Sequence, residues 1–140
     1  MENTVYIGAM GYSGQKFDIE KARIMINQAF DLFETQYADR KLAVVSGYTN
    51  LGIPALAYEE ATKRGWITVG VACDKANEYE VYPCDEVQIV GDNWGDESAS
   101  FLVMCHVFVR VGGGKQSMRE TAQAKADGKF VYEFELEPLA

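Results

Sequence analysis

The sequence predicts an α/β fold in which a mostly parallel sheet is covered by helices. Apolar runs of strand length alternate along the chain with segments whose apolar residues recur at helical spacing. Residues 42–45 are almost wholly apolar, as expected of a parallel strand buried on both faces. Most of the 13 glycines follow a predicted strand and precede the next helix. Because open α/β sheets bind ligands at the carboxyl ends of their strands, this pattern also predicts where a ligand would bind.

The first half of the chain alternates strands and helices. Residues 4–7 form an apolar strand, and a glycine-rich turn follows at residues 8–14. Asp18 is a suitable N-cap for the next segment, residues 18–37, in which the apolar side chains repeat at helical spacing. The apolar positions of this helix are Ala22, Ile26, Ala29, Phe30, Phe33 and Tyr37.

The strand at residues 42–45 is followed by a second helix and a third strand. Residues 53–64 form this helix, with Pro54 tolerated in its first turn. Gly65 occupies the position just after the helix, where glycine commonly ends one. Residues 66–72 form the third strand.

The second half of the chain repeats the alternation. Residues 86–90 form a fourth strand, residues 96–105 a helix and residues 107–111 the next strand. A helix at residues 117–126 follows. The last strand, residues 129–136, alternates apolar and polar residues, which is typical of a strand near a sheet edge.

The order of elements, β-α-β-α-β-β-α-β-α-β, predicts a Rossmann-like three-layer sandwich with a mostly parallel sheet of about six strands. Right-handed crossovers place helices on both faces of such a sheet. The length of 140 residues suits one domain, residues 1–140, with a hydrophobic core of its own.

Composition argues against several classes of protein. The net charge of −8 disfavours general nucleic-acid binding, which depends on basic residues. The apolar runs are shorter than the ~20 residues of a membrane span, and residues 1–4 lack the basic start of a signal peptide, so a cytoplasmic protein is expected. Cys73, Cys84 and Cys105 are widely spaced, which favours reduced thiols. With His106 as the single histidine, no metal site is predicted.

The most informative stretch is the triple glycine at residues 112–114, between the strand at 107–111 and the next helix. Glycine lets a ligand approach the backbone, and a helix N-terminus offers unpaired N–H groups. Together they predict a seat for an anion, most often phosphate. Ser117 and Glu120 also match a capping box, S-x-x-E, which requires no ligand.

Acidic and aromatic residues follow other strand ends and allow more than one interpretation each. Asp92, Asp96 and Glu97 would hold Mg²⁺ together with ligand phosphates, or would complement the dipole of the following helix. Tyr12, Tyr48 and Trp94 would stack on a nucleobase, or would shield loop backbone or make a subunit contact.

Residues 113–120, GGKQSMRE, resemble the signature P-G-G-x-G-T-x-x-E of the lysine decarboxylase-like, or Lonely-guy (LOG), proteins. These belong to the wider SLOG superfamily of Rossmann-like proteins, which also includes molybdenum-cofactor carrier proteins. Residues 46–53 resemble the second glycine turn of the family, S-G-G-x-x-G-[IVL]-M, and residues 8–14 resemble its first turn. The resemblance extends over nearly the whole chain.

The resemblance implies that a nucleotide, or a phosphorylated ligand derived from one, binds at the strand ends. It also implies a homo-oligomer. Glu120 would be the catalytic carboxylate if the protein, like enzymatic members, hydrolyses the N-glycosidic bond of nucleoside 5′-monophosphates. The ligand-binding residues would be Gly8, Gly11, Ser13, Gly47, Tyr48, Thr49, Asn50, Gly52, Gly113, Gly114, Lys115, Gln116 and Ser117.

The sequence departs from the family pattern at three positions, and the third departure bears on whether the protein hydrolyses its ligand. Gly112 replaces a proline and Gln116 a glycine, and a loop tolerates both changes. Glu97 falls where the hydrolases carry an arginine. A carboxylate there repels phosphate, so ligand binding is the leading interpretation and phosphoribohydrolase activity the alternative. Mg²⁺ would be an addition to a bound nucleotide.

Overall fold

The computed structural model describes residues 3–140 and contains one six-stranded sheet with the order β4-β3-β2-β1-β5-β6. Every neighbouring pair of strands is parallel, which confirms the predicted α/β fold. The strands are β1 (Thr4–Gly11), β2 (Lys41–Ser46), β3 (Ile67–Ala72), β4 (Glu86–Ile89), β5 (Val107–Val111) and β6 (Phe130–Phe134). The helices are α1 (Ile19–Gln36), α2 (Gly52–Lys63), the short 3-10 helix η1 (Asp74–Glu78), α3 (Ser98–Met104) and α4 (Lys115–Ala126).

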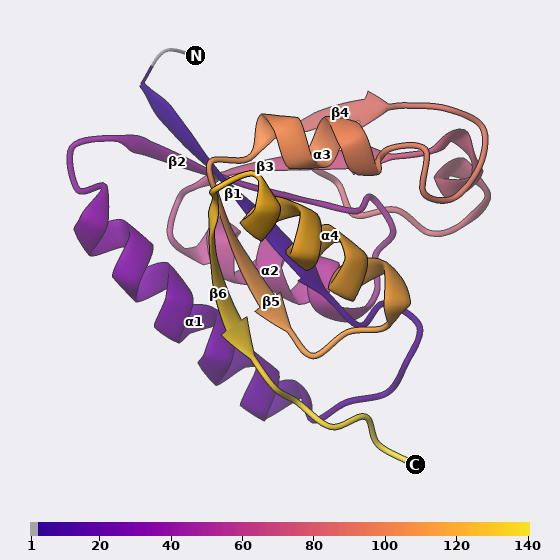
Figure 1. The fold of residues 1–140 in the computed structure, drawn as a ribbon, viewed down its shortest axis with the longest axis horizontal. Helices are drawn as coiled ribbons and strands as arrows, with labels where there is room; N and C mark the ends of the chain where they lie inside the picture. Colours follow the sequence, from indigo (N-terminus) through magenta and orange to yellow (C-terminus); the bar gives the residue numbers. More distant parts are fainter. Residues whose placement is uncertain (1–2) are drawn as a thin grey trace.

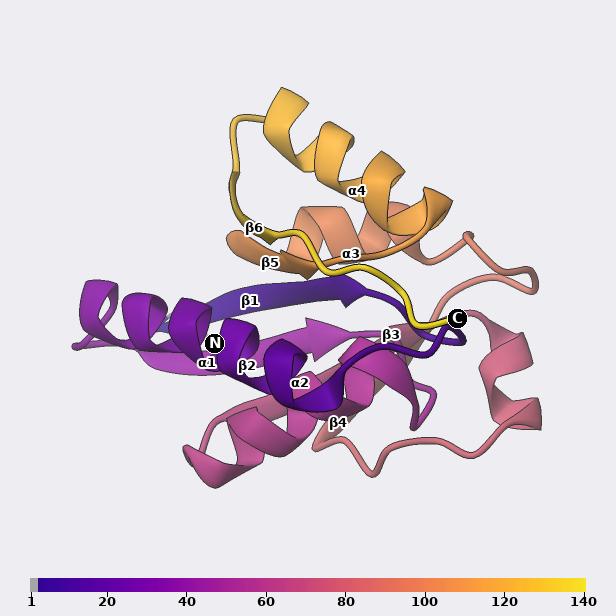
Figure 2. The ribbon, with the colours of Figure 1, turned by 90° about the horizontal axis from the view of Figure 1, so that it is seen from below.

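The α-helices form a layer on each side of the sheet (Figures 1 and 2). Figure 2 shows α1 and α2 below the sheet and α3 and α4 above it. Successive residues of a strand point to opposite faces, so β1 and β2 contribute side chains to both cores. Val44 packs with the α1 and α2 side chains, whereas Val45 packs with Phe101 of α3 and Ala124 of α4.

Strand β1 is longer than the sequence predicts. It continues through Gly11, so the predicted glycine turn at residues 8–14 is wrong for its first half. Gly8 is paired within the sheet with Phe108 and Val45. A Cβ atom at Gly8 would lie 2.5 Å from Phe108 Cδ2 and 2.8 Å from Phe101 Cζ. Glycine is therefore needed here because two aromatic rings fill the space above the strand.

Helix boundaries match the sequence signals where the cap is local. Asp18 accepts a hydrogen bond from Lys21 N at 3.1 Å and caps α1 as predicted. Gly65, with φ +76°, follows α2 as predicted. The predicted starts of α3 at Asp96 and of α4 at Ser117 are wrong, because α3 begins at Ser98 and α4 at Lys115. Strand β6 is at a sheet edge, as its alternation indicates.

Among the described residues, no helix combines the length and the apolar character needed to cross a membrane.

Candidate functional site

A cavity of about 430 Å³ opens at the carboxyl ends of β1, β2 and β3. Its walls come from the turns after these strands, the N-terminus of α4 and the loop that precedes α3. Figure 1 shows the start of α4 beside the end of β1, where Ser117 Oγ donates to the carbonyl oxygen of Gly11 at 3.2 Å. The predicted site residues that line the cavity are Gly11, Ser13, Gly47, Tyr48, Thr49, Gly114, Lys115, Gln116, Ser117 and Glu120.

Four predicted binding residues do not line this cavity. Gly8 is covered by aromatic rings, and Asn50 Nδ2 donates to Glu80 Oε2 at 2.7 Å. Gly52 has φ +67° and packs against the backbone of the turn after β1. Gly113 has φ +115°, and a Cβ there would lie 2.6 Å from Ser117 Cβ. Gly8 therefore lies within β1, whereas Asn50, Gly52 and Gly113 shape the turns whose neighbouring residues form the cavity wall.

The N-terminus of α4 is open. Gly114 is its N-cap residue and makes no side-chain cap. Between residues 3 and 140, the main-chain N–H groups of Lys115, Gln116 and Ser117 have no hydrogen-bond acceptor. The predicted capping box is wrong, because Ser117 lies inside the helix and its hydroxyl donates to Gly11. The positive end of the helix dipole therefore reaches the cavity through uncapped amides.

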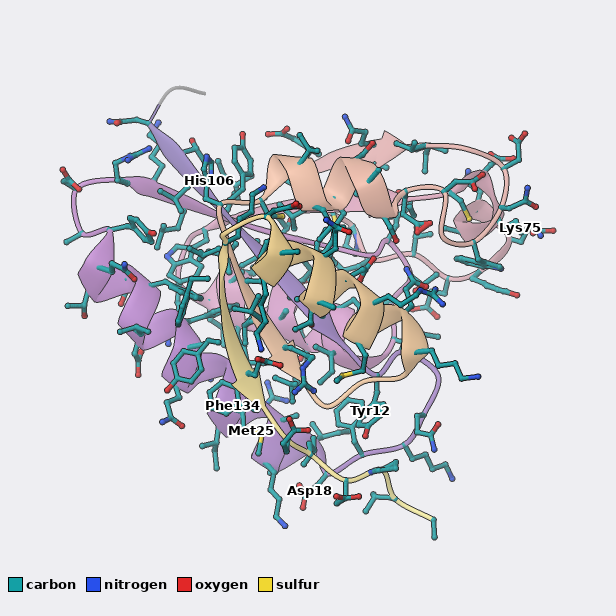
Figure 3. The ribbon with its side chains drawn as sticks, viewed as in Figure 1. Tyr12, Asp18, Met25, Lys75, His106 and Phe134 are labelled. Atoms are coloured by element: carbon teal, nitrogen blue, oxygen red, sulfur yellow. The ribbon has the colours of Figure 1, made fainter. Side chains whose placement is uncertain are left out.

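The N-terminus of α2 differs, although a similar glycine turn precedes it. Ile53 N donates to the carbonyl oxygen of Tyr12 at 2.7 Å. The Tyr12 phenol donates to Leu136 O at 2.8 Å, and Figure 3 shows Tyr12 near the segment that follows β6. The N–H group of Ile53, which a ligand would need at the N-terminus of α2, is thus already hydrogen-bonded to the turn after β1. This contrast makes α4 the better anion seat of the two.

Glu120 is held at the cavity wall by hydrogen bonds from two side chains. Its Oε2 accepts from Ser98 Oγ at 2.7 Å and from Gln116 Nε2 at 3.3 Å. Burial raises the pKa of the Glu120 carboxyl, and repulsion from Glu97 adds to this effect, although both hydrogen bonds oppose it. A raised pKa makes Glu120 better able to hold a proton, as a general acid must. Ser98 carries no motif, so sequence reasoning did not find it.

Glu97, which falls where the hydrolases of the resembled family carry an arginine, also lines the cavity. Only 8% of the residue is exposed, and its Oε1 accepts from Gly95 N at 3.1 Å. Asp96 has a different role, because its Oδ2 accepts from the N–H groups of Asp92 and Asn93 at 3.1 and 3.0 Å. In the part of the chain that the structure describes, no group of three or more His, Cys, Asp and Glu side chains is placed to hold a metal ion.

All three aromatic residues considered for stacking, Tyr12, Tyr48 and Trp94, line the cavity. The Trp94 indole is half exposed and stacks on Tyr79, with ring centroids 5.7 Å apart and an angle of 10° between the planes. His106 lies at the opposite end of the sheet from Tyr12 (Figure 3) and accepts a hydrogen bond from Tyr6 N. The histidine is therefore a structural residue, as predicted.

The parallel sheet, the helices on both faces and the cavity at the strand ends define a Rossmann-like α/β protein. The chain belongs to the SLOG cluster4 family, whose sequence profile matches residues 4–138. This match confirms the resemblance that residues 113–120 indicate.

Solved structures share this fold at low sequence identity. The molybdenum cofactor carrier protein from Chlamydomonas reinhardtii is 23% identical, with a TM-score of 0.73 over 93% of this chain and 76% of that one. The molybdenum cofactor binding protein from the phototrophic bacterium Rippkaea orientalis is 20% identical, with a TM-score of 0.73 over 95% and 77%. The structural genomics target TM1055 is 22% identical, with a TM-score of 0.71 over 91% and 72%. No curated protein matches the chain.

Proposed function

We propose that this protein binds a small phosphorylated ligand, a nucleotide or a molecule derived from one, in the cavity at the strand ends. The phosphate would bind at the N-terminus of α4. The observation that carries this proposal is the set of uncapped main-chain N–H groups at Lys115, Gln116 and Ser117, three residues that line the cavity. Phosphates bind helix N-termini because the amides and the dipole both favour negative charge.

The surroundings of these amides support the proposal. Gly114 brings no Cβ toward the cavity, and Lys115 adds a positive charge beside the amides. Two solved proteins with this fold are a carrier and a binding protein of the molybdenum cofactor, which supports a small-molecule ligand for this chain. A phosphorylated ligand needs an anion seat next to a cavity, and residues 114–116 would supply it.

The two buried carboxylates constrain how such a ligand lies. Glu97 and Glu120 line the cavity beyond the first turn of α4. Ionised carboxylates repel phosphate, so the phosphate would stay at Lys115 while an uncharged or donor-rich part of the ligand lies beside the two acids. The cavity therefore has an anion end and an acceptor end.

Two glycines at the cavity wall offer a matched test of where the phosphate binds. A Cβ at Gly114 or at Gly14 would meet no heavy atom within 4 Å, so Gly114→Val and Gly14→Val should both fold. Calorimetric titration with nucleoside 5′-monophosphates and the corresponding nucleosides measures affinity. We expect the monophosphate to bind more than about tenfold tighter than the nucleoside, and Gly114→Val alone to abolish this difference. Equal affinity for the nucleoside, or an unchanged Gly114→Val, would contradict the proposal.

A second candidate function is hydrolysis of the N-glycosidic bond of a nucleoside 5′-monophosphate. The raised pKa of Glu120, in a cavity that would hold the ribose beside it, favours this candidate. Chromatography would detect free base released from each monophosphate. Release that disappears in Glu120→Gln would establish the hydrolase, whereas binding without release would leave the protein a carrier or sensor.

We also propose that residues 1–140 form a single domain and that copies of this domain assemble into a homo-oligomer. Strand β4 is at a sheet edge and exposes about two fifths of Val87 and Ile89. Exposed apolar edge strands favour pairing with another chain. Light scattering would give the mass, and Val87→Lys should shift it to that of one chain if this edge pairs.

A further inference from the structure

The acceptor end of the cavity contains a carboxylate whose hydrogen bonds are incomplete. Glu97 is more than nine-tenths buried and lines the cavity. Its Oε1 accepts one hydrogen bond, from Gly95 N at 3.1 Å. Among residues 3–140, no side-chain or main-chain group donates to Oε2. An ionised carboxylate has room for about four hydrogen bonds and cannot donate. Oε2 is not among the buried atoms that lack a partner, so its free positions accept from water or from a donor on a bound ligand.

The chemistry of the donor follows from the geometry of a carboxylate. Its two oxygens lie side by side and accept two adjacent N–H groups at once, as in pairs with arginine. Among common heterocycle edges, guanine offers such a pair in N1–H and the 2-amino group. Adenine and cytosine place an acceptor nitrogen beside their amino group, and hypoxanthine lacks the 2-amino group. The 2-amino-oxo edge, which guanine and pterins share, is therefore the best match to Glu97.

An independent observation points to a planar group at the same place. Trp94 and Glu97 belong to one loop, and both line the cavity. The Trp94 ring is half exposed, and its stacking on Tyr79 holds it in position. The exposed part of the indole at the cavity wall is an apolar surface that a stacked flat heterocycle would cover. A heterocycle stacked on Trp94 would present its edge to the carboxylate that follows in the loop.

We infer that the phosphorylated ligand carries a 2-amino-oxo heterocycle whose ring is stacked on Trp94. The 2-amino group and the adjacent ring N–H, which is N1–H in guanine and N3–H in a pterin, donate to Glu97. This inference rests on the proposed function, since the phosphate at Lys115 fixes the opposite end. Glu120 belongs to the same acceptor end, where its Oε2 accepts a hydrogen bond from Ser98, the residue next to Glu97 in sequence. Glu97 thus acts as the residue that determines specificity.

Matched pairs of ligands that differ at position 2 test this assignment. One pair is GMP and IMP, and the other is a pterin monophosphate and the corresponding lumazine monophosphate, so the two pairs distinguish a nucleotide from a pterin as the source of the edge. Calorimetric titration would be carried out on the wild type and on Glu97→Gln, Glu97→Asp and Trp94→Ala. Glu86→Gln, which removes an exposed carboxylate of β4, is the control.

We expect the 2-amino member of at least one pair to bind the wild type roughly tenfold or more tightly than its partner. Glu97→Gln and Glu97→Asp should reduce this ratio toward unity, Trp94→Ala should weaken both members, and Glu86→Gln should change neither. Equal binding within each pair, or a ratio that survives both Glu97 variants, overturns the inference. Binding of AMP but of neither 2-amino ligand overturns it while the proposed function stands. If no phosphorylated ligand binds, the proposed function itself fails.

Discussion

Ser98 Oγ donates a 2.7 Å hydrogen bond to Oε2 of Glu120 and thereby joins the first residue of α3 to the second turn of α4. The bond fixes a buried carboxylate at the cavity wall. This hydrogen bond favours the ionised carboxylate and so lowers the pKa of Glu120, whereas burial raises it. The balance between these two effects can be measured through the pH dependence of stability.

We expect Glu120 to make the protein less stable as pH rises above the carboxyl's ordinary pKa of 4.5. The folded state binds this proton more tightly than the unfolded state, so the stabilisation is present at low pH and is lost as pH rises through the raised pKa. Glu120→Gln should remove this loss, and Ser98→Ala should extend it to higher pH. Urea unfolding at several pH values measures the difference between wild type and variant. Parallel curves for wild type and Glu120→Gln would show that Glu120 is not perturbed.

Glu60 should give a pH dependence of the opposite sign. Its buried carboxylate accepts hydrogen bonds from Asn27 Nδ2 at 2.9 Å, Lys63 Nζ at 3.0 Å and Arg23. Burial alone would raise its pKa, but these three donors outweigh burial and hold the pKa below 4.5. The stabilisation is therefore present above the unfolded pKa and is lost as pH falls through the lower folded value.

Glu60→Ala should lower the free energy of unfolding by about 2 kcal/mol near neutral pH, because it leaves buried donors without an acceptor. Glu59→Ala is the matched control. Glu59 is half exposed and lies 3.6 Å from the same guanidinium, so its loss should cost less than about 0.5 kcal/mol. Chemical denaturation measures both, and equal costs would show that burial of Glu60 does not matter.

Adjacent glycines in the turn before α4 should differ in their tolerance of a side chain. Gly113 has φ +115°, and its Cβ would lie 2.6 Å from Ser117 Cβ, so Gly113→Ala should destabilise the fold by about 1–3 kcal/mol. Gly114 has φ −96° and open space around its Cβ, so Gly114→Ala should cost less than about 1 kcal/mol. Thermal unfolding followed by circular dichroism compares them. A Gly113→Ala variant as stable as wild type would contradict the geometry.

The architecture was predictable from sequence because burial in a layered α/β fold leaves a local periodicity. Residues 42–45 and 107–111 read as buried strands, and Asp18 and Gly65 mark helix ends through contacts within a few residues. The place of the anion seat was predictable for the same reason, because the triple glycine and the helix that follows it are adjacent in the sequence.

The remainder depends on contacts between distant segments. Gly8 reads as a turn residue until Phe108 is placed beside it in the sheet. Ser117 and Glu120 read as a capping box until Gly11 and Ser98 take their hydrogen bonds. These partners lie far apart in sequence, so no local pattern could show which hydrogen bond each side chain makes.

The three cysteines are free thiols, as their spacing predicts, and Cys84 is the most accessible of them. Burial raises the pKa of the Cys84 thiol to about 11, and the neighbouring Asp85 carboxylate adds to this effect. The thiolate is the form that reacts with thiol reagents, and near pH 8 only about 0.1% of Cys84 would be present as thiolate. Burial also raises the pKa of Cys105, while Cys73 is fully buried.

We therefore expect slow labelling of the native protein by a disulfide reagent near pH 8, and rapid labelling of all three thiols in denaturant. The native rate should rise about tenfold for each unit of pH up to about 11, because the thiolate fraction rises in that proportion. Cys84→Ser separates this thiol from the other two, and mass spectrometry locates the label. A fast native phase near pH 8 that disappears in Cys84→Ser would mean that the Cys84 thiolate is stabilised, contrary to its burial beside Asp85.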